Sequence, residues 1–282
     1  MKKVLLFFLI VFLVIAALGL VMTFKGKVSL GDKVALVRVS GIILDSTDVI
    51  EELKGYSKDR SVKAIVLRVD SPGGGVAPSQ EIYEEILKIK ENKKVVVSMG
   101  SVAASGGYYI SAPADVIVAN AGTLTGSIGV IMEIPNVSNL MEKIGVDTQV
   151  IKSGKHKDMA SVFKSLTPEE KEILQAVLDD VHDQFIEAVA EARGMEPEVV
   201  RKLSDGRIFT GRMAKGMGLV DELGNLEDAI MLAGKLTGIK GEPNVVYKEE
   251  EFSFIDMLRG EIPNNLMGNV FSGISLKYLL TP

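Results

Sequence analysis

The chain has 282 residues, 47% of them hydrophobic and 24% charged, a balance typical of a protein that folds around a core. It contains no cysteine, which excludes disulfides, thiol nucleophiles and cysteine-ligated metals, and two histidines make a multi-histidine metal site a poor hypothesis. The net charge of −5 argues against nucleic-acid binding, which requires a basic face.

An uncharged apolar run lies near the N-terminus, from Val4 to Phe24, with two lysines on each side. As a helix it spans about 31 Å, the thickness of the hydrocarbon core of a bilayer. A cleaved signal peptide is the alternative, but its apolar region is usually about 7–15 residues long and ends in small residues. We therefore predict one uncleaved transmembrane helix within residues 1–27. Lysines at both ends leave its orientation open.

Short β-branched runs then alternate with helical patterns. Strands are predicted at 34–43, 63–70, 95–100, 115–120 and 148–153. Helices are predicted at 79–92, 137–145, 168–193, 197–204 and 225–237. Apolar strands of this kind are typical of a largely parallel sheet with both faces covered. The alternation therefore predicts an α/β fold.

The helix at 168–193 has the clearest boundaries. Thr167 is its expected N-cap, Pro168 takes the first helical position, and Glu170 completes a capping box. Gly194 is the expected C-cap.

The first of three glycine-rich corners is Asp70–Gly75, with the sequence DSPGGG, between a predicted strand and a predicted helix. Consecutive glycines leave backbone N–H groups accessible, and a following helix N-terminus adds positive potential. Such a corner suits a phosphate or a carbonyl oxyanion. Its glycine spacing is not that of a dinucleotide-binding motif, and a simple tight turn is the alternative.

The second corner, residues 98–108, holds two serines among small residues. The hydroxyl of Ser105 is reachable there, but a serine becomes nucleophilic only beside a base. The N–H of Gly106 would then help to hold an oxyanion. Ser105 as a plain helix N-cap and Ser101 as the nucleophile are the alternatives.

The third corner, residues 122–130, is too irregular for a strand and too apolar for a solvent-exposed loop, so it either lines a cleft or is structural.

The residues considered so far do not identify the general base that would activate the serine. His156 lies in a charged loop and His182 in a well-formed helix, so a Ser-His-Asp triad is weakly supported. A lysine is possible, because burial can supply the roughly 4 kcal/mol that keeps an amine neutral near pH 7.

Four segments in order, DSPGGG, SVAASGGYYISAPAD, GTLTGSIGV and SGKHKDM, resemble the signal peptide peptidase A family of membrane-bound Ser/Lys proteases. The resemblance covers about residues 33–240 and implies a Clp protease/crotonase-like α/β fold in its short, single-domain form. By motif, it implies that Ser105 is the nucleophile and Lys157 the general base. Lys152 and Lys155 lie close to Lys157 in the sequence and are alternatives for the base.

The same resemblance assigns supporting roles. Ser127 matches the serine that hydrogen-bonds the lysine amine, and Gly74 with the N–H of Gly106 matches the oxyanion hole. Residues 251–282 match no motif of the family; they are apolar with few charges, and either pack on their own domain or contact a subunit or the membrane. The implied division is a membrane anchor at 1–27, a peptidase domain at 28–240 and a C-terminal arm at 241–282.

The resemblance also implies a function. It is a membrane-bound serine endopeptidase that degrades cleaved signal peptides and other apolar peptides, with a catalytic domain outside the cytoplasm and neither metal nor cofactor. Single-domain members assemble into homo-oligomeric rings whose subunits share active sites. The alternatives are a crotonase-like acyl-CoA enzyme, which would use the same oxyanion hole on a thioester, and a catalytically silent membrane scaffold.

Overall fold

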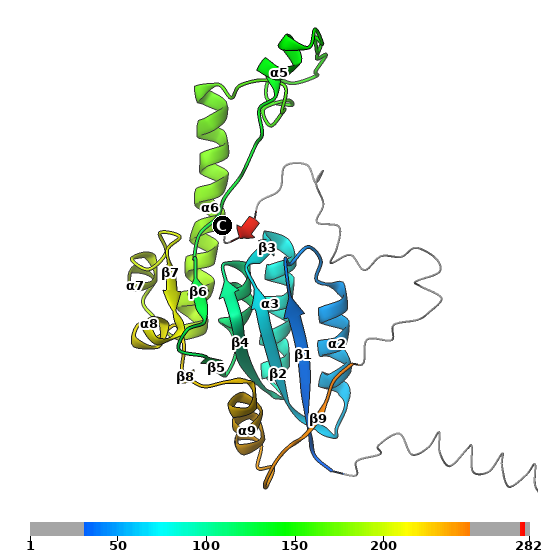
Figure 1. The fold of residues 1–282 in the computed structure, drawn as a ribbon, viewed down its shortest axis with the longest axis vertical. Helices are drawn as coiled ribbons and strands as arrows, with labels where there is room; N and C mark the ends of the chain where they lie inside the picture. The colour runs from blue at the N-terminus through cyan, green and yellow to red at the C-terminus, as the bar shows by residue number, and fades with distance from the viewer. Residues whose placement is uncertain (1–30, 249–276, 280–282) are drawn as a thin grey trace, which may run out of the picture. The chain divides into compact units, whose positions relative to one another are not determined.

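The computed structural model describes residues 31–248 and 277–279 (Figure 1). The transmembrane helix predicted within residues 1–27, and most of the C-terminal arm, lie outside these residues. Within the described part of the chain, no helix combines the length and apolarity needed to cross a bilayer.

The elements have the following bounds. The strands are β1 (Lys33–Ser40), β2 (Val62–Ser71), β3 (Gly73–Gly75), β4 (Lys94–Ala104), β5 (Val116–Ala119), β6 (Leu124–Gly126), β7 (Ile208–Thr210), β8 (Glu222–Leu223), β9 (Asn244–Val246) and β10 (Lys277–Leu279). The helices are α2 (Thr47–Lys58), α3 (Val76–Lys90), α4 (Gly106–Ser111), α5 (Ser138–Lys143), α6 (Pro168–Arg193), α7 (Pro197–Arg201), α8 (Gly211–Gly216) and α9 (Leu226–Leu236).

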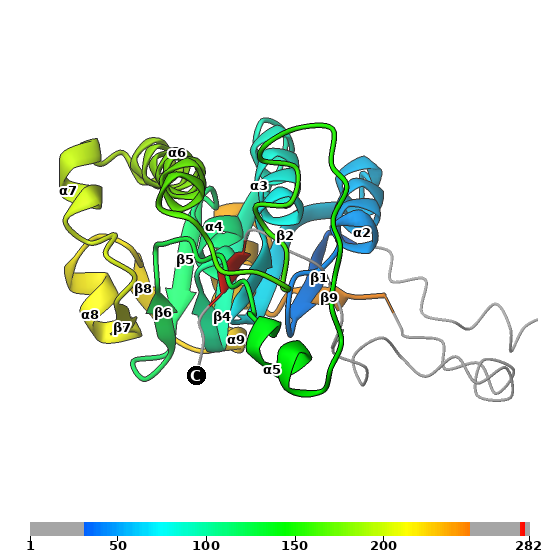
Figure 2. The ribbon, with the colours of Figure 1, turned by 90° about the horizontal axis from the view of Figure 1, so that it is seen from above.

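The main sheet has the strand order β7-β6-β4-β2-β1-β9, with β5 beside β4 and β8 beside β5. Every adjacent pair in it is parallel except β6 with β7. Helices α2, α3 and α6 lie on one side and α9 on the other (Figure 2). Alternate residues of the central strands therefore enter two separate apolar clusters, one per face. This arrangement confirms the predicted α/β fold with a largely parallel sheet.

Most predicted elements are present, and one is wrong. The runs at 34–43, 63–70, 95–100 and 115–120 form β1, β2, β4 and β5, although β4 continues to Ala104. The run at 148–153 is not a strand: it pairs with no strand among the described residues, and its Ile151 is fully exposed. Helix α2, which the sequence analysis left unassigned, turns Leu53 into the core.

Helix α6 has the predicted ends. Thr167 and Glu170 form the capping box, and Gly194 adopts the left-handed conformation of a C-cap. Val181 and Phe185, in its second half, are buried, but Glu170 is the only buried residue of its first three turns. The first half of α6 therefore extends beyond the sheet, together with residues 131–166, which we call the projecting loop (Figure 1).

Candidate active site

Ser105 occupies the sharp turn between β4 and α4. Its backbone has φ 55° and ψ −120°, a conformation that costs a non-glycine residue about 1–3 kcal/mol. The turn is held from both sides, because the N–H of Ser105 donates to Gly126 O at 2.8 Å and its carbonyl accepts from Tyr109 N at 2.8 Å. The residue is 1% exposed, and its Oγ has no hydrogen-bond partner among the described residues. The fold thus holds a serine hydroxyl that no described residue engages.

Two glycine backbones meet beside this turn. A Cβ on Gly106 would lie 3.1 Å from Gly74 N and 2.7 Å from Ser79 Oγ, and a Cβ on Gly74 would lie 2.0 Å from Ile43 O. No side chain fits at either position, so glycine is required by close approach. The corners at 70–75 and 98–108, which only the family resemblance connects in the sequence, therefore lie in contact.

The N–H of Gly74 has a defined direction. Ile43 N donates to Gly73 O at 3.0 Å, and Gly75 N donates to Ile43 O at 2.7 Å. Successive peptide groups of a strand point to opposite sides, so the N–H of Gly74 faces away from Ile43. It is therefore free of the contacts that fix β3 to Ile43.

Ser127 joins the same region from the third corner. It follows Gly126, whose carbonyl accepts from Ser105 N, and its own backbone has φ 50°. Its N–H donates to Arg207 O at 2.9 Å, and the residue is 6% exposed. Ser105 and Ser127 are thus neighbours, although they come from the corners at 98–108 and 122–130. Gly74 and Gly106 are neighbours in the same way.

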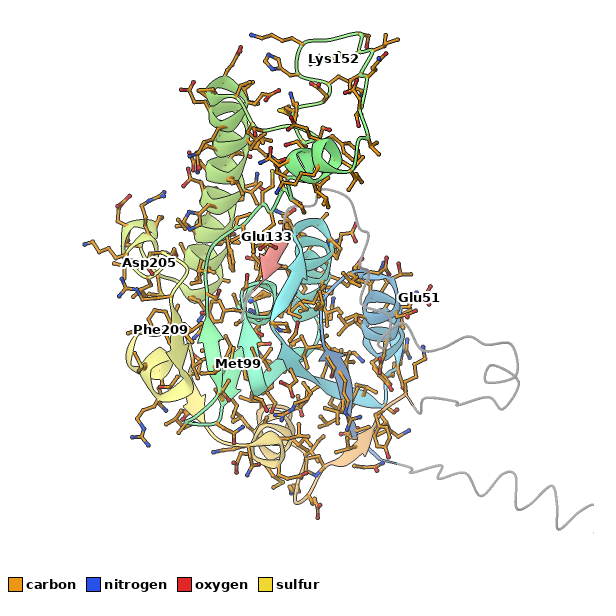
Figure 3. All side chains as sticks on the ribbon, turned by 45° about the horizontal axis from the view of Figure 1, so that its top comes forward. Glu51, Met99, Glu133, Lys152, Asp205 and Phe209 are labelled. Atoms are coloured by element: carbon orange, nitrogen blue, oxygen red, sulfur yellow. The ribbon has the colours of Figure 1, made fainter. Side chains whose placement is uncertain are left out.

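Lys157 is not joined to this cluster within one chain. It lies exposed in a turn of the projecting loop, where its N–H bonds Gly154 O at 3.2 Å. Figure 3 shows Lys152 of the same loop well away from Met99 in β4. Ser105 Oγ correspondingly has no described partner.

The neighbouring lysines of the loop are engaged in ion pairs. Lys152 Nζ lies 2.5 Å from Asp158 Oδ1, and the hydrogen bond from Lys152 holds the pKa of Asp158 below its usual value. Lys155 pairs with Glu169. Lys157 has neither a hydrogen bond nor an ion pair from its ammonium to any described residue. Among the described residues, the amines of Lys152 and Lys155 are thus engaged by carboxylates, whereas that of Lys157 is not.

A third ion pair ties the loop to helix α6. Lys164 Nζ lies 2.5 Å from Glu170 Oε1 and 3.2 Å from Asp158 Oδ1. The hydrogen bond to Glu170, and then that to Asp158, raises the pKa of Lys164. Glu170 also accepts from Thr167 N at 3.0 Å, so one carboxylate both caps the helix and anchors the loop.

Comparison with known proteins decides the family. The model of peptidase family S49 matches residues 88–240, more than half of the chain. The chain belongs to family S49. It is a serine peptidase of this Ser/Lys family, similar to signal peptide peptidase A. The Clp protease model matches residues 43–124, which hold both glycine corners, and the fold is accordingly Clp protease/crotonase-like.

Three relatives illustrate the breadth of the match. The chain is 46% identical to the Synechocystis sp. protein named "Putative protease slr0021", over 76% of this chain and 77% of that protein. It is 38% identical to Protease 4 of Salmonella typhi over 83% of this chain and 39% of the relative. It is 31% identical to the chloroplastic serine protease SPPA of Arabidopsis thaliana, over 86% of this chain and 36% of the relative.

The two histidines of this S49 peptidase have no contact with Ser105. His156 Nε2 lies 3.6 Å from Glu169, and His182 is in the body of α6. Within residues 31–248 and 277–279, no group of three or more His, Asp or Glu side chains is arranged to hold a metal.

Sequence reasoning missed three groups that build the site. Ser79 Oγ donates to Gly75 O at 2.8 Å, and Ser71 Oγ accepts from Gly73 N at 3.1 Å, so two hydroxyls fix the glycine strand. Arg207, beyond α6 in the sequence, holds Ser127 through its carbonyl. The two serines flank the glycines closely enough to be noticed in the sequence, whereas nothing in it points to Arg207.

Proposed function

We propose that this S49 peptidase is a membrane-anchored endopeptidase that cleaves leftover signal peptides and similar apolar peptides with Ser105 as nucleophile and Lys157 as base. The observation that carries the proposal is the buried, unengaged hydroxyl of Ser105 in a strained turn beside Gly74 and Gly106. Strained turns of this kind present nucleophiles in other hydrolases. Ser101, by contrast, is exposed within β4.

The residues perform the reaction in two steps. The neutral amine of Lys157 takes the proton of Ser105 Oγ as that oxygen attacks the peptide carbonyl, and the N–H groups of Gly74 and Gly106 hold the oxyanion. The protonated lysine then gives its proton to the departing amine, leaving an acyl-enzyme. Water, activated by the same amine, attacks the acyl group and releases the carboxylic acid product. Ser127 Oγ orients the amine throughout.

The lysine of each site comes from a neighbouring copy of the chain. Ser105 has no base among the described residues of its own chain, and Lys157 stands exposed on a loop that projects from the fold. The same loop exposes several large apolar side chains, which a monomer would leave in water. They are Leu140, Ile144, Val146, Val150, Ile151 and Phe163. These features support a homo-oligomeric ring with shared active sites.

The apolar run from Val4 to Phe24 supports a single-pass anchor in the cell membrane, with the peptidase domain outside the cytoplasm. An enzyme tethered at the bilayer meets signal peptides, which are themselves apolar. The small-residue surroundings of Ser105 favour small or aliphatic side chains at the position preceding the cleaved bond. Signal peptides that remain in the membrane thus match both the location of the enzyme and the small-residue surroundings of Ser105.

A peptidase assay with the purified full chain tests the proposal. Ser105→Ala should lower hydrolysis of an apolar fluorogenic peptide by at least ~10³-fold, because the nucleophile is lost, whereas Ser101→Ala keeps substantial activity. A fluorophosphonate probe should label the native chain and not Ser105→Ala. Labelling of Ser105 would count against the crotonase-like alternative, which uses the oxyanion hole without a serine nucleophile, and absence of both labelling and hydrolysis would favour a silent scaffold. Retained activity in Ser105→Ala would show that the wrong serine is named.

A further inference from the structure

The central strand β4 changes its partner along its length. Its first part, which ends at Met99 (labelled in Figure 3), pairs with β5, and its last part pairs with β6. On the other side of β4 the register against β2 shifts at the same point, because Val69 pairs with Met99 but Ser71 pairs with Ala103. A single residue of β2, Asp70, therefore stands opposite three residues of β4.

The resulting bulge in β4, residues 100–102, lies directly before the serine turn. A bulge leaves backbone groups without a ladder partner and bends the strand that contains it. Only Ala103 and Ala104 separate this bulge from Ser105. The direction in which β4 leaves the bulge therefore sets the position of the serine.

Side chains from neighbouring segments engage the backbone of the bulge. Asp70 Oδ1 accepts a hydrogen bond from Val102 N at 3.0 Å, and Thr123 Oγ1 donates to Gly100 O at 2.7 Å. A Cβ on Gly100 would lie 2.6 Å from Asp70 Cγ, so the carboxylate rests directly on the glycine backbone. The side chain of Asp70 thus fills the space that the bulge opens in the sheet.

The backbone of Asp70 contacts the other half of the site. Its carbonyl accepts from Gly41 N at 3.0 Å. Two residues later in the same loop, Ile43 holds β3 at both ends, through Gly73 O and Gly75 N. Asp70 therefore joins the strand that carries the serine to the loop that holds the glycine strand.

We propose that Asp70 is a positioning residue for Ser105, which holds the bulge of β4 through Val102 so that the serine hydroxyl meets a substrate carbonyl beside Gly74. The inference rests on the proposed function, because it takes Ser105 as the nucleophile. Asp70 acts through the backbone and not on the reacting atoms. Such an effect can be large, because a misplacement of about 1 Å in a reacting group can lower a rate about 10²-fold.

This role requires a hydrogen-bond acceptor at position 70 and not a negative charge. Asp70→Asn keeps an oxygen that can accept from Val102 N, whereas Asp70→Ala removes it. In Asp70→Ala, kcat for an apolar peptide should fall about 10²-fold while KM stays within about threefold of the native value. In Asp70→Asn both constants should stay within about threefold of native. The rate constant of fluorophosphonate labelling should follow kcat, because both need attack by Ser105.

Asp115 offers a matched control on the same strand. Its Oδ2 accepts from Val95 N at 2.8 Å, near the start of β4 and away from Ser105, and its Oδ1 lies 2.8 Å from Lys94 Nζ. Asp115→Ala should lower the urea midpoint of unfolding at least as much as Asp70→Ala does, because it loses a hydrogen bond and an ion pair. It should leave kcat within about twofold of native.

Hydrogen exchange, resolved to single amides by mass spectrometry, measures the contact without catalysis. Val102 should exchange faster in Asp70→Ala and at the native rate in Asp70→Asn, whereas Val95 should exchange faster only in Asp115→Ala. Gly100→Ala keeps the carboxylate but displaces it from Val102, so it should reproduce both effects of Asp70→Ala. It replaces Asp70→Ala in the comparison if that variant does not fold.

Unchanged exchange of Val102 in Asp70→Ala would overturn the contact. Faster exchange with an unchanged kcat would overturn the positioning role, and so would an Asp70→Asn chain as slow as Asp70→Ala, because the charge would then be what matters. Failure of the proposed function would show differently: the native chain would neither hydrolyse peptides nor be labelled at Ser105, whatever the exchange of Val102 gives.

Discussion

At the scale of single residues, the backbone of Ser105 is the clearest sign of a specialised site. Its φ of 55° and ψ of −120° belong to a region that glycine adopts readily and other residues avoid. The surrounding hydrogen bonds, to Gly126 and from Tyr109, are made by backbone groups and do not involve the hydroxyl. These backbone hydrogen bonds therefore hold the turn regardless of the side chain at position 105.

This strain predicts a stability difference between two inactive variants. Ser105→Gly should be about 1 kcal/mol more stable than Ser105→Ala, because glycine relieves the turn and alanine keeps its strain. Urea denaturation of the full chains measures the difference. The same pair at Ser101, inside β4, should show the reverse order, since glycine weakens a strand. Equal stabilities at position 105 would mean that the turn is not strained.

The proposed base predicts a pH-dependent rate and a strict requirement for lysine. Peptidase activity should rise with pH, because only the neutral amine of Lys157 accepts a proton. Lys157→Arg should be as inactive as Lys157→Ala, because a guanidinium stays charged. Lys152→Arg is the control: it can keep the ion pair with Asp158 and should keep most of the activity. Rates of the four chains from pH 6 to pH 10 test this, and an active Lys157→Arg would place the base elsewhere.

At the scale of elements, the first half of α6 carries the projecting loop. That half buries almost no apolar side chain, so the cap and the ion pairs of Glu170 have to hold its end. The hydrogen bond from Lys164 holds the pKa of Glu170 below its ordinary 4.5, and the N–H of Thr167 adds to this. A carboxyl with a lowered folded-state pKa contributes stability above its ordinary pKa, and this contribution is lost as the pH falls through the folded value.

The loop should therefore loosen in acid before the sheet does. Hydrogen-exchange protection of the segment 158–170 should decline as the pH falls below about 4, while protection in β2 persists. Glu170→Gln should weaken this protection already at pH 7, because it removes the charge that pairs with Lys164. Glu169→Gln, one residue earlier and facing Lys155 at the surface, should weaken it less. A segment as well protected in Glu170→Gln as in the native chain would contradict this role.

Local chemistry made several elements predictable from the sequence. These signals come from residues that are close together in the sequence, so the sequence pattern predicts them. They are the capping residues of α6 and the apolar runs of β1, β2, β4 and β5. The run at 148–153 has the same β-branched composition but forms no strand. A strand also requires a neighbouring strand to pair with, and the local sequence does not indicate whether one is present.

The features of the site that the sequence did not predict depend on contacts between residues far apart in the chain. The contact of Gly106 with Gly74 could be foreseen only from a family resemblance, since it depends on how β3 and α4 pack. The support of Ser127 by Arg207 joins residues far apart in the chain. The pairing of β10 with β3 is of the same kind, and no local motif announces it.

At the scale of the whole molecule, the two halves of the proposed dyad occupy different parts of the architecture. Ser105 is buried at the end of a central strand, and Lys157 is exposed on the projecting loop. Within the described part of one chain, the proposed nucleophile has no hydrogen-bond partner and the proposed base lies away from it on the projecting loop. Assembly of copies brings the two together if the loop of one chain reaches the serine turn of the next.

Mixing two inactive variants tests this arrangement. Ser105→Ala and Lys157→Ala should each be inactive alone, but a mixture that exchanges subunits should recover activity wherever an intact Ser105 meets an intact Lys157 of the neighbouring chain. Random mixing of equal amounts should restore about a quarter of the native sites, because each site then draws its two residues independently. A double variant, Ser105→Ala with Lys157→Ala, mixed with Lys157→Ala is the control and should stay inactive. If exchange is demonstrated by mass spectrometry and the first mixture also stays inactive, each chain must complete its own site.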